Sequence, residues 1–284
     1  DTIDAYYQTA GRDVQIKLAA SYKRLSNPWK RYGGQLKGMK ALDLANTKRK
    51  EEAVIQDFID TYPERKSAYG NILTELRRLY DEKRETAQWE LALFYLSRSS
   101  TIFKNAYKVH LASIERRKRN TDREAIFKER NLGATLLRMK RDLRNFHQPS
   151  DKAILKELLI RAAAVITDKR PIPAITDMLA KYNAEEKGIE KAVDDFLRDA
   201  YAQTRLTDES YLTGLMTGQR KTTGLPDDPF IRLAADLYPC YKKMRQTSKK
   251  RRAIRDRLLS RWVDAKKEYL GRDFVPDANS TMRI

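Results

Sequence analysis

The segment from Glu64 to Arg117 contains no proline and a single glycine, Gly70. Its apolar and aromatic residues recur near the helical period of 3.6 residues. They are Leu73, Leu76, Leu79, Tyr80, Trp89, Leu93, Leu96, Phe103, Tyr107 and Leu111. One straight helix of this length would reach about 80 Å, so we expect a bend or short turn inside the segment. With nine prolines and eleven glycines in 284 residues, the whole chain is predicted to be all-α.

Prolines and polar clusters divide the rest of the chain into further predicted helices. They cover residues 2–25, 29–59, a stretch ending at Leu143, and residues 151–166, 172–182, 185–204, 208–217 and 229–270, the last with a bend at Pro239. A break is expected at Ser26-Asn27-Pro28, because a residue before proline avoids the α region and Asn is a good helix cap. Ser150 or Asp151 is predicted to cap the helix that follows His147-Gln-Pro, and residues 219–228 are predicted to form a loop.

The end of the chain has a different pattern. Residues 280–284 alternate small or polar with apolar side chains and are rich in strand formers, yet no partner strand follows. We therefore expect an elongated helical domain over residues 1–276, and the start of a severed β-strand at residues 277–284. On this interpretation the chain is a piece of a larger protein.

The chain is strongly basic. Its 58 Lys and Arg against 39 Asp and Glu give a net charge of +19, which predicts attraction to polyanions such as nucleic acid or a membrane surface. Basic runs such as Arg116–Arg119 and Lys249–Arg252 are more often solvated helix faces. No apolar run is long enough to span a membrane, and the first residues do not resemble a signal peptide. The single Cys240 is predicted to be a small buried residue.

Little catalytic machinery is recognisable. No phosphate-binding glycine loop, nucleophile elbow, His-Glu-x-x-His motif or cysteine pair is present. The two histidines, His110 and His147, fall on different predicted elements, and each is predicted to be a surface or capping residue. The acidic pairs Asp194-Asp195 and Asp227-Asp228 are adjacent rather than helically spaced, so they do not present a shared metal face. We expect neither a metal nor a cofactor.

Asn27 has two candidate roles, the cap of a helix and the binding of a ligand. From the residues alone, a helix cap before Pro28 is the favoured role. The neighbouring Trp29-Lys-Arg-Tyr32 mixes aromatic and basic side chains that can stack on nucleic-acid bases, although an aromatic residue at a helix start more often joins the core.

Three segments together resemble one family, the bacterial dipeptidyl-peptidase 7 and 11 family of chymotrypsin-like serine exopeptidases. They are Ala20-Ser-Tyr-Lys-Arg-Leu-Ser-Asn-Pro-Trp-Lys30 with Gly34 and Gly38, Pro149-Ser-Asp-Lys-Ala-Ile-Leu-Lys-Glu-Leu-Leu159, and Asp277-Ala-Asn-Ser-Thr-Met-Arg283. The stretch Asp228–Asp236 fits more loosely. The resemblance covers essentially the whole chain in one order, and Pro28 stands where the family usually has another residue.

The resemblance implies a helical lid domain inserted in a double β-barrel that carries a Ser-His-Asp triad outside this chain. Such a lid would cover the active-site cleft, block long extensions of the substrate and help the protein release N-terminal dipeptides. The chain alone would then be inactive. The resemblance also implies that Asn27 binds the free amine of the peptide substrate, and that the protein is periplasmic, or secreted to the bacterial cell surface.

The partners implied are peptides and the β-barrel of the same parent chain, whereas nucleic acid is not expected. The alternative from another class is a free-standing basic helical protein that binds nucleic acid or an acidic partner. A third interpretation is a homodimer formed through the long helical segment Glu64–Arg117, which an exposed apolar seam would support.

Overall fold

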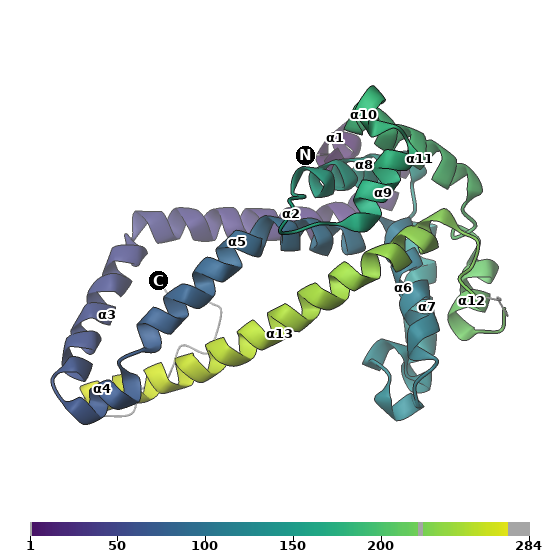
Figure 1. Ribbon diagram of the computed structural model, residues 1–284. Coiled ribbons are helices and arrows are strands. Elements are labelled where there is room, and N and C mark those ends of the chain that lie inside the picture. Colours follow the sequence, from purple (N-terminus) through teal and green to yellow (C-terminus); the bar gives the residue numbers. More distant parts are fainter. Residues whose placement is uncertain (1, 221–223, 272–284) are drawn as a thin grey trace. The chain divides into compact units, whose positions relative to one another are not determined.

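The computed structural model describes residues 2–220 and 224–271 (Figure 1), and the regular elements in them are helices. The α-helices are α1 (Thr2–Thr9), α2 (Arg12–Ala41), α3 (Leu44–Asp60), α4 (Pro63–Tyr69), α5 (Ile72–Ser99), α6 (Thr101–Glu115), α7 (Glu129–Arg144), α8 (Gln148–Ala164), α9 (Pro173–Lys181), α10 (Ala184–Lys187), α11 (Ile189–Gln203), α12 (Glu209–Thr217) and α13 (Pro229–Leu270). Two short 3-10 helices, η1 (Asn120–Asp122) and η2 (Ala125–Phe127), lie between α6 and α7.

The all-α prediction is confirmed for these residues, which contain no strand beyond an isolated bridge between Thr167 and Arg170. The predicted strand at residues 277–284 lies outside them, as do residues 221–223 of the predicted loop. None of the helices that are described is long and apolar enough to cross a membrane.

The chain divides into two compact units. Unit 1 comprises residues 1–26 and 87–244, and unit 2 comprises residues 27–86 and 245–284. The boundaries fall inside α2, α5 and α13, so each unit contains one part of these helices. The single helical domain expected over residues 1–276 stays a prediction.

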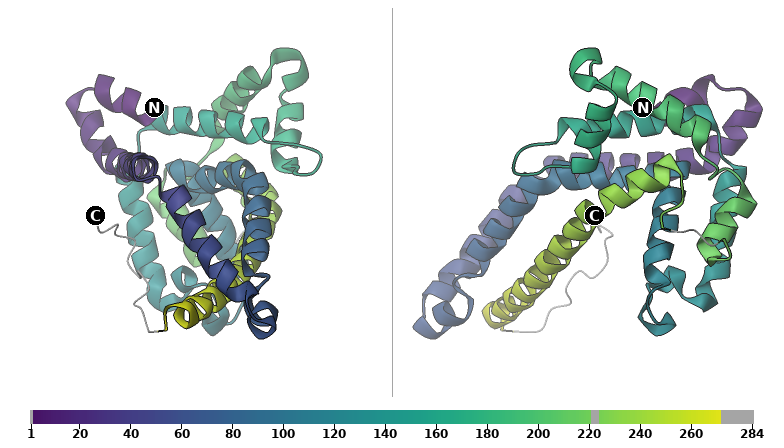
Figure 2. Two further views of the ribbon diagram at one scale, coloured as in Figure 1. Left: turned by 90° about the vertical axis from the view of Figure 1, so that its left-hand side faces the viewer. Right: turned by 45° about the vertical axis from the view of Figure 1, so that its right-hand side comes forward.

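Unit 1 has an extensive apolar core. Helix α11 packs against α8, α9 and α10, while α12 packs against α6 and α7, and α1 against α8 (Figures 1 and 2). Fully buried side chains include Phe103 of α6, Leu155 and Leu159 of α8, and Phe230 at the start of α13. Burial of this kind stabilises by about 1.5–3 kcal/mol for each large side chain, so packing, rather than helix propensity, holds these helices together.

Unit 2 has a smaller core. Ile55 and Ile59 of α3 are buried with Ala265 of α13, and Phe58, Tyr69 and Trp262 pack around them. The second half of α2, from Asn27 onward, contributes none of these residues. It instead exposes large apolar side chains at helical spacing, namely Trp29, Tyr32, Leu36 and Met39.

The predicted break at Ser26–Pro28 is wrong, because α2 continues through Pro28 to Ala41. A proline inside a helix removes one hydrogen bond, here from position 28 to the carbonyl of Arg24, and it costs about 3 kcal/mol. The other hydrogen bonds of this 30-residue helix and the burial of Leu18 outweigh that loss. The predicted helix 29–59 is divided later, where Asp43 adopts a left-handed conformation with φ of 44° before α3.

The turn expected inside Glu64–Arg117 is confirmed, since the segment divides into α4, α5 and α6. The break before α6 is made by Ser100, whose side chain accepts a hydrogen bond from the backbone N–H of Phe103 at 3.1 Å. Asp208 caps α12 in the same way. The predicted helix 185–204 is divided at Gly188, whose φ of 83° suits glycine. Helix α13 continues through Pro239.

Candidate functional site

Asn27, the predicted substrate-binding residue, lies inside α2 with an exposed side chain. Because the helix continues on both sides of it, Asn27 cannot be the helix cap that the residues alone favoured. Its side chain has no hydrogen-bond partner in the part of the chain that the structure describes. The amide oxygen and amide hydrogens are therefore available to a ligand.

The face of α2 that carries Asn27 also carries two glycines. Gly34 and Gly38 follow Asn27 by seven and eleven residues, which correspond to about two and three helical turns, so the three residues share a face. A side chain added at Gly34 would meet no other atom within 4 Å. Glycine inside a helix costs about 1 kcal/mol relative to alanine. An extended ligand could approach the helix backbone closely along this face.

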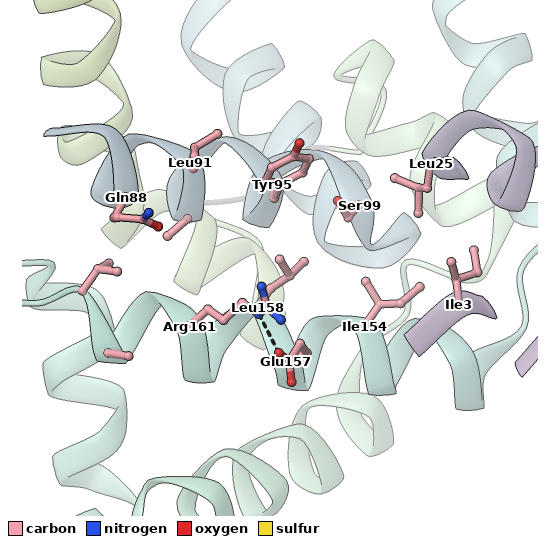
Figure 3. Close-up of a pocket in the computed structure, with 13 residues that line it drawn as sticks. Ile3, Leu25, Gln88, Leu91, Tyr95, Ser99, Ile154, Glu157, Leu158 and Arg161 are labelled. Carbon is pink, nitrogen blue, oxygen red and sulfur yellow. Dashed lines mark hydrogen bonds and ion pairs between the residues drawn. The ribbon is translucent and has the colours of Figure 1, made fainter. Parts of the chain in front are cut away.

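A cleft of about 460 Å³ lies within unit 1. In Figure 3, Gln88, Leu91, Tyr95 and Ser99 of α5 face Ile154, Glu157, Leu158 and Arg161 of α8, with Ile3 and Leu25 at one end. Most of the lining side chains are apolar, and Leu91 and Tyr95 are exposed. A cleft of this size and character can hold an apolar group.

The polar groups of this cleft do not form a reaction centre. Arg161 and Glu157 pair with each other one turn apart on α8. Ser99 lines the cleft, but no histidine or cysteine does. A serine without a base is a weak nucleophile. The cleft therefore offers mainly apolar contacts.

His147 and Ser150 lie at the distance of a nucleophile and its base, with 3.1 Å between His147 Nδ1 and Ser150 Oγ. Ser150 is nevertheless buried, and its hydroxyl donates to the backbone carbonyl of His147 at 3.0 Å. His147 Nδ1 accepts from the backbone N–H of Ser150. The pair thus forms the N-terminal cap of α8. His147 is a capping residue as predicted, whereas the prediction that Ser150 or Asp151 caps this helix is wrong.

Asp151 instead accepts hydrogen bonds at the beginning of α6. Its carboxylate accepts from the Ser100 hydroxyl at 2.7 Å, from the backbone N–H groups of Thr101 and Ile102, and from the Tyr201 hydroxyl at 2.7 Å. Burial raises the pKa of Asp151, and these donors act in the opposite direction by stabilising the carboxylate. Burial, with the nearby Asp151, also raises the pKa of the Tyr201 hydroxyl. Since its oxygens are occupied by α6 and α11, Asp151 is a structural residue.

Asp228 has the same role at the start of α13. One oxygen accepts from the backbone N–H groups of Phe230 and Ile231, at 3.0 and 3.3 Å. The other accepts from the Thr204 hydroxyl at 2.7 Å and from the backbone N–H of Arg205 at 3.2 Å. Asp228 is almost fully buried, so the carboxylate joins the end of α11 to the start of α13.

The prediction for His110 is wrong, because this residue is buried in unit 1 rather than at the surface or at a cap. Neither ring nitrogen has a hydrogen-bond partner. The ring packs edge-on against Tyr238, with 5.1 Å between the two ring centroids. Burial lowers the pKa of His110. Cys240 is buried as predicted, and burial raises the pKa of its thiol. No group of three or more potential metal ligands lies together in residues 2–220 and 224–271.

The sequence reasoning missed the roles of Asp151 at α6 and Asp228 at α13. Asp228 stands directly before Pro229, and Asp followed by proline at a predicted helix start is a recognisable capping pattern. Asp151 gives no comparable signal, because the helix that it caps begins 50 residues earlier in the chain.

The comparisons with known proteins agree with the family resemblance found in the sequence. The family model described as peptidase S46 matches residues 2–284. The chain is 30% identical over 291 residues to a protein of Shewanella putrefaciens named Asp/Glu-specific dipeptidyl-peptidase, covering 100% of this chain and 37% of that protein. It is 23% identical over 279 residues to dipeptidyl-peptidase 7 of Porphyromonas gingivalis, covering 97% of this chain and 37% of that protein.

A shorter match, 36% identical over 76 residues, links the chain to an Asp/Glu-specific dipeptidyl-peptidase of Capnocytophaga gingivalis, with 27% of this chain and 10% of that protein covered. The chain spans little more than a third of the length of the relatives that it matches along its whole length. The match of the family model over residues 2–284 shows that the chain belongs to the peptidase S46 family of dipeptidyl peptidases.

Proposed function

We propose that this chain is the helical lid domain of a serine-type dipeptidyl peptidase, inserted in a catalytic β-barrel that the chain itself does not contain. In this proposal the lid covers the active-site cleft and limits cleavage to N-terminal dipeptides. Asn27 accepts a hydrogen bond from the free amine of the peptide. The observation that carries the role of Asn27 is its exposed, unpartnered amide inside α2.

Family membership supports the enzymatic context, because the relatives from Shewanella putrefaciens and Porphyromonas gingivalis are named dipeptidyl peptidases and extend well beyond the matched region. The described residues support the proposal that catalysis belongs to the part of the protein outside this chain. His147 and Ser150 are used in a helix cap, and His110 is enclosed in the core, so neither histidine is placed as a general base. We therefore expect this chain to be inactive without the remainder of the protein.

The chemistry of an asparagine suits recognition of an ammonium group. Its amide oxygen accepts a hydrogen bond, and a charge-assisted bond of this kind is worth about 1.5–3 kcal/mol. At Gly34, where an added side chain would meet no atom within 4 Å, there is space for the peptide beside the helix. Lys30 and Arg31 follow Asn27 by three and four residues and repel a cation. Amine binding at Asn27 therefore needs a compensating carboxylate from outside this helix.

The proposal includes the setting of the enzyme. We place the protein in the periplasm or at the bacterial cell surface, where it would act on oligopeptides. Cell fractionation with an antibody against this domain tests that location, and recovery in the cytoplasm alone would contradict it.

The experiment that tests the function is dipeptide release by the full-length protein. Matched peptides with free and acetylated N-termini are compared for the wild type, Asn27→Ala and the control Gln35→Ala. Gln35 supplies the same amide group on the same helix, and alanine is the best helix former, so both variants should fold. We expect Asn27→Ala to lower kcat/KM for the free-amine peptide about tenfold or more.

The control Gln35→Ala should retain the wild-type value, and acetylation should abolish most of the activity of the wild type. An equal loss in both variants would contradict the role of Asn27. A wild-type protein without peptidase activity would contradict the enzymatic context. The alternative of a free-standing nucleic-acid-binding protein is not favoured by the family match.

A further inference from the structure

A second, polar cavity of about 400 Å³ lies in unit 1. Its lining comes from the first part of α2, the first turn of α6, and the end of α7 with the residue that follows it. The lining residues are Ala20, Ser21, Arg24, Thr101, Lys104, Arg141, Asp142 and Asn145. The proposed role of Asn27 uses none of these side chains.

The charges in this cavity are unbalanced. Arg24, Lys104 and Arg141 are cationic, whereas Asp142 is the only acidic residue in the lining. Lys104 Nζ lies 2.7 Å from Asp142 Oδ2, so this carboxylate is already paired. Neither Arg24 nor Arg141 has a hydrogen bond or ion pair of its side chain within the described residues.

Lys108 adds a further positive charge one turn after Lys104 on α6. It is largely buried, and burial together with the charge of Lys104 lowers its pKa to about 8. Asp142 partly opposes this shift, whereas Arg138 and Arg24 reinforce it. Burial is the first cause of this shift, and the neighbouring cations add to it.

Neutral donors complete the lining. The hydroxyl groups of Ser21 and Thr101 and the side-chain amide of Asn145 can each donate a hydrogen bond. Two guanidinium groups from different helices, together with these hydroxyl and amide donors, suit the planar or tetrahedral oxygens of carboxylate and phosphate. A cavity of about 400 Å³ fits a small molecule rather than a folded partner.

We propose that the cavity formed by Arg24, Lys104 and Arg141 binds a small polyvalent oxyanion, either a free phosphate or a molecule carrying carboxylate groups. The anion supplies the negative charge that Asp142 alone does not provide. Arg24 and Arg141 bind it directly from α2 and α7, and binding holds these two helices against the start of α6.

Isothermal titration calorimetry of the full-length protein with inorganic phosphate, and separately with citrate, tests the proposal. Both titrations are made at pH 7 and constant ionic strength. Arg24→Gln and Arg141→Gln each remove one exposed cation from the lining. We expect each to weaken binding about tenfold, as for the loss of one charge-assisted hydrogen bond. Arg130→Gln on α7 removes the same charge outside the lining and should leave the affinity unchanged.

Comparison of the two anions shows whether the natural ligand is a phosphate or a carboxylate. Tighter binding of phosphate identifies a phosphate site, and tighter binding of citrate identifies a carboxylate site. Either result supports the proposal if Arg24 and Arg141 are required. No binding of either anion, or equal weakening by Arg130→Gln, would overturn it. Because the readout is binding alone, failure here leaves the proposed peptidase function unaffected.

Discussion

The hydroxyl of Tyr201 donates a hydrogen bond to the carboxylate of Asp151 at 2.7 Å, and both residues are buried. The same carboxylate accepts from Ser100 and from the first backbone N–H groups of α6. One aspartate on α8 thus ties α11 to the beginning of α6. Helices that are distant in sequence are held in one arrangement by a single buried acceptor.

Removal of this acceptor should destabilise unit 1. Asp151→Asn keeps the shape but places an amide group against donors, and we expect the free energy of unfolding to fall by about 2–4 kcal/mol. Tyr201→Phe removes one donor and keeps the ring contact with Phe230, so a smaller loss of about 1 kcal/mol is expected. Urea unfolding followed by circular dichroism measures both.

The matched control is Asp177→Asn, which changes an exposed aspartate on α9 and should alter stability by less than about 0.5 kcal/mol. If Asp151→Asn were as mild as this control, the carboxylate would not be the organising acceptor.

Asp228 and its neighbour Asp227 form an internal comparison. Asp228→Ala leaves four donors without their acceptor, and a loss of about 2–4 kcal/mol is expected. The side chain of Asp227 is 90% exposed and pairs with Arg232, so Asp227→Ala should cost less than about 1 kcal/mol. Thermal unfolding monitored at 222 nm distinguishes the two, and similar melting temperatures would refute the capping role.

Much of the helical organisation was predictable from local pattern. The helix predicted over residues 208–217 corresponds to α12, and Asp at a cap position is a local signal of the kind that Asp208 provides. The continuation of α2 through Pro28 could not be predicted in this way, because it depends on the balance between one lost hydrogen bond and the packing of the whole helix.

The candidate sites likewise differ in how far the sequence could predict them. Asn27 was chosen because of a resemblance, and its exposure follows from its place in α2. The cavity at Arg24, Lys104 and Arg141 was not predicted, because its residues come from three helices that are distant in the sequence. Burial of His110 was also missed, since a lone histidine gives no sequence signal for its depth.

The contribution of Lys108 to the free energy of unfolding should rise between about pH 8 and the unfolded pKa of lysine, near 10.5. Its folded pKa is lowered to about 8, so in this range the unfolded state binds more protons than the folded state. Below pH 8 both states are protonated, and the full cost of burying the charge is present. A lowering of the pKa from 10.5 to about 8 sets an upper limit of about 3–4 kcal/mol on this gain.

Urea unfolding of the wild type and Lys108→Met at pH 7 and pH 10 tests this linkage. The tyrosines and the remaining lysines titrate in both proteins, so their effects cancel in the difference between the two free energies of unfolding. The variant should be more stable at pH 7, and the difference should shrink at pH 10. A difference independent of pH would show that Lys108 affects stability by packing alone.

Pro28→Ala should stabilise the protein. The change restores a backbone N–H that can donate to the Arg24 carbonyl inside α2, worth about 3 kcal/mol for a helix interior. The greater freedom of alanine in the unfolded chain offsets about 0.4–1 kcal/mol of this, so we expect a net gain of about 2 kcal/mol. Hydrogen exchange at residues 24–32 should slow, and the melting temperature should rise.

Pro229→Ala is the control, because Pro229 occupies the first position of α13, where a proline costs nothing. This variant should give no gain in stability. A Pro28→Ala protein that is no more stable than the wild type would show that α2 is interrupted at this point, and Asn27 would then be free to act as a cap.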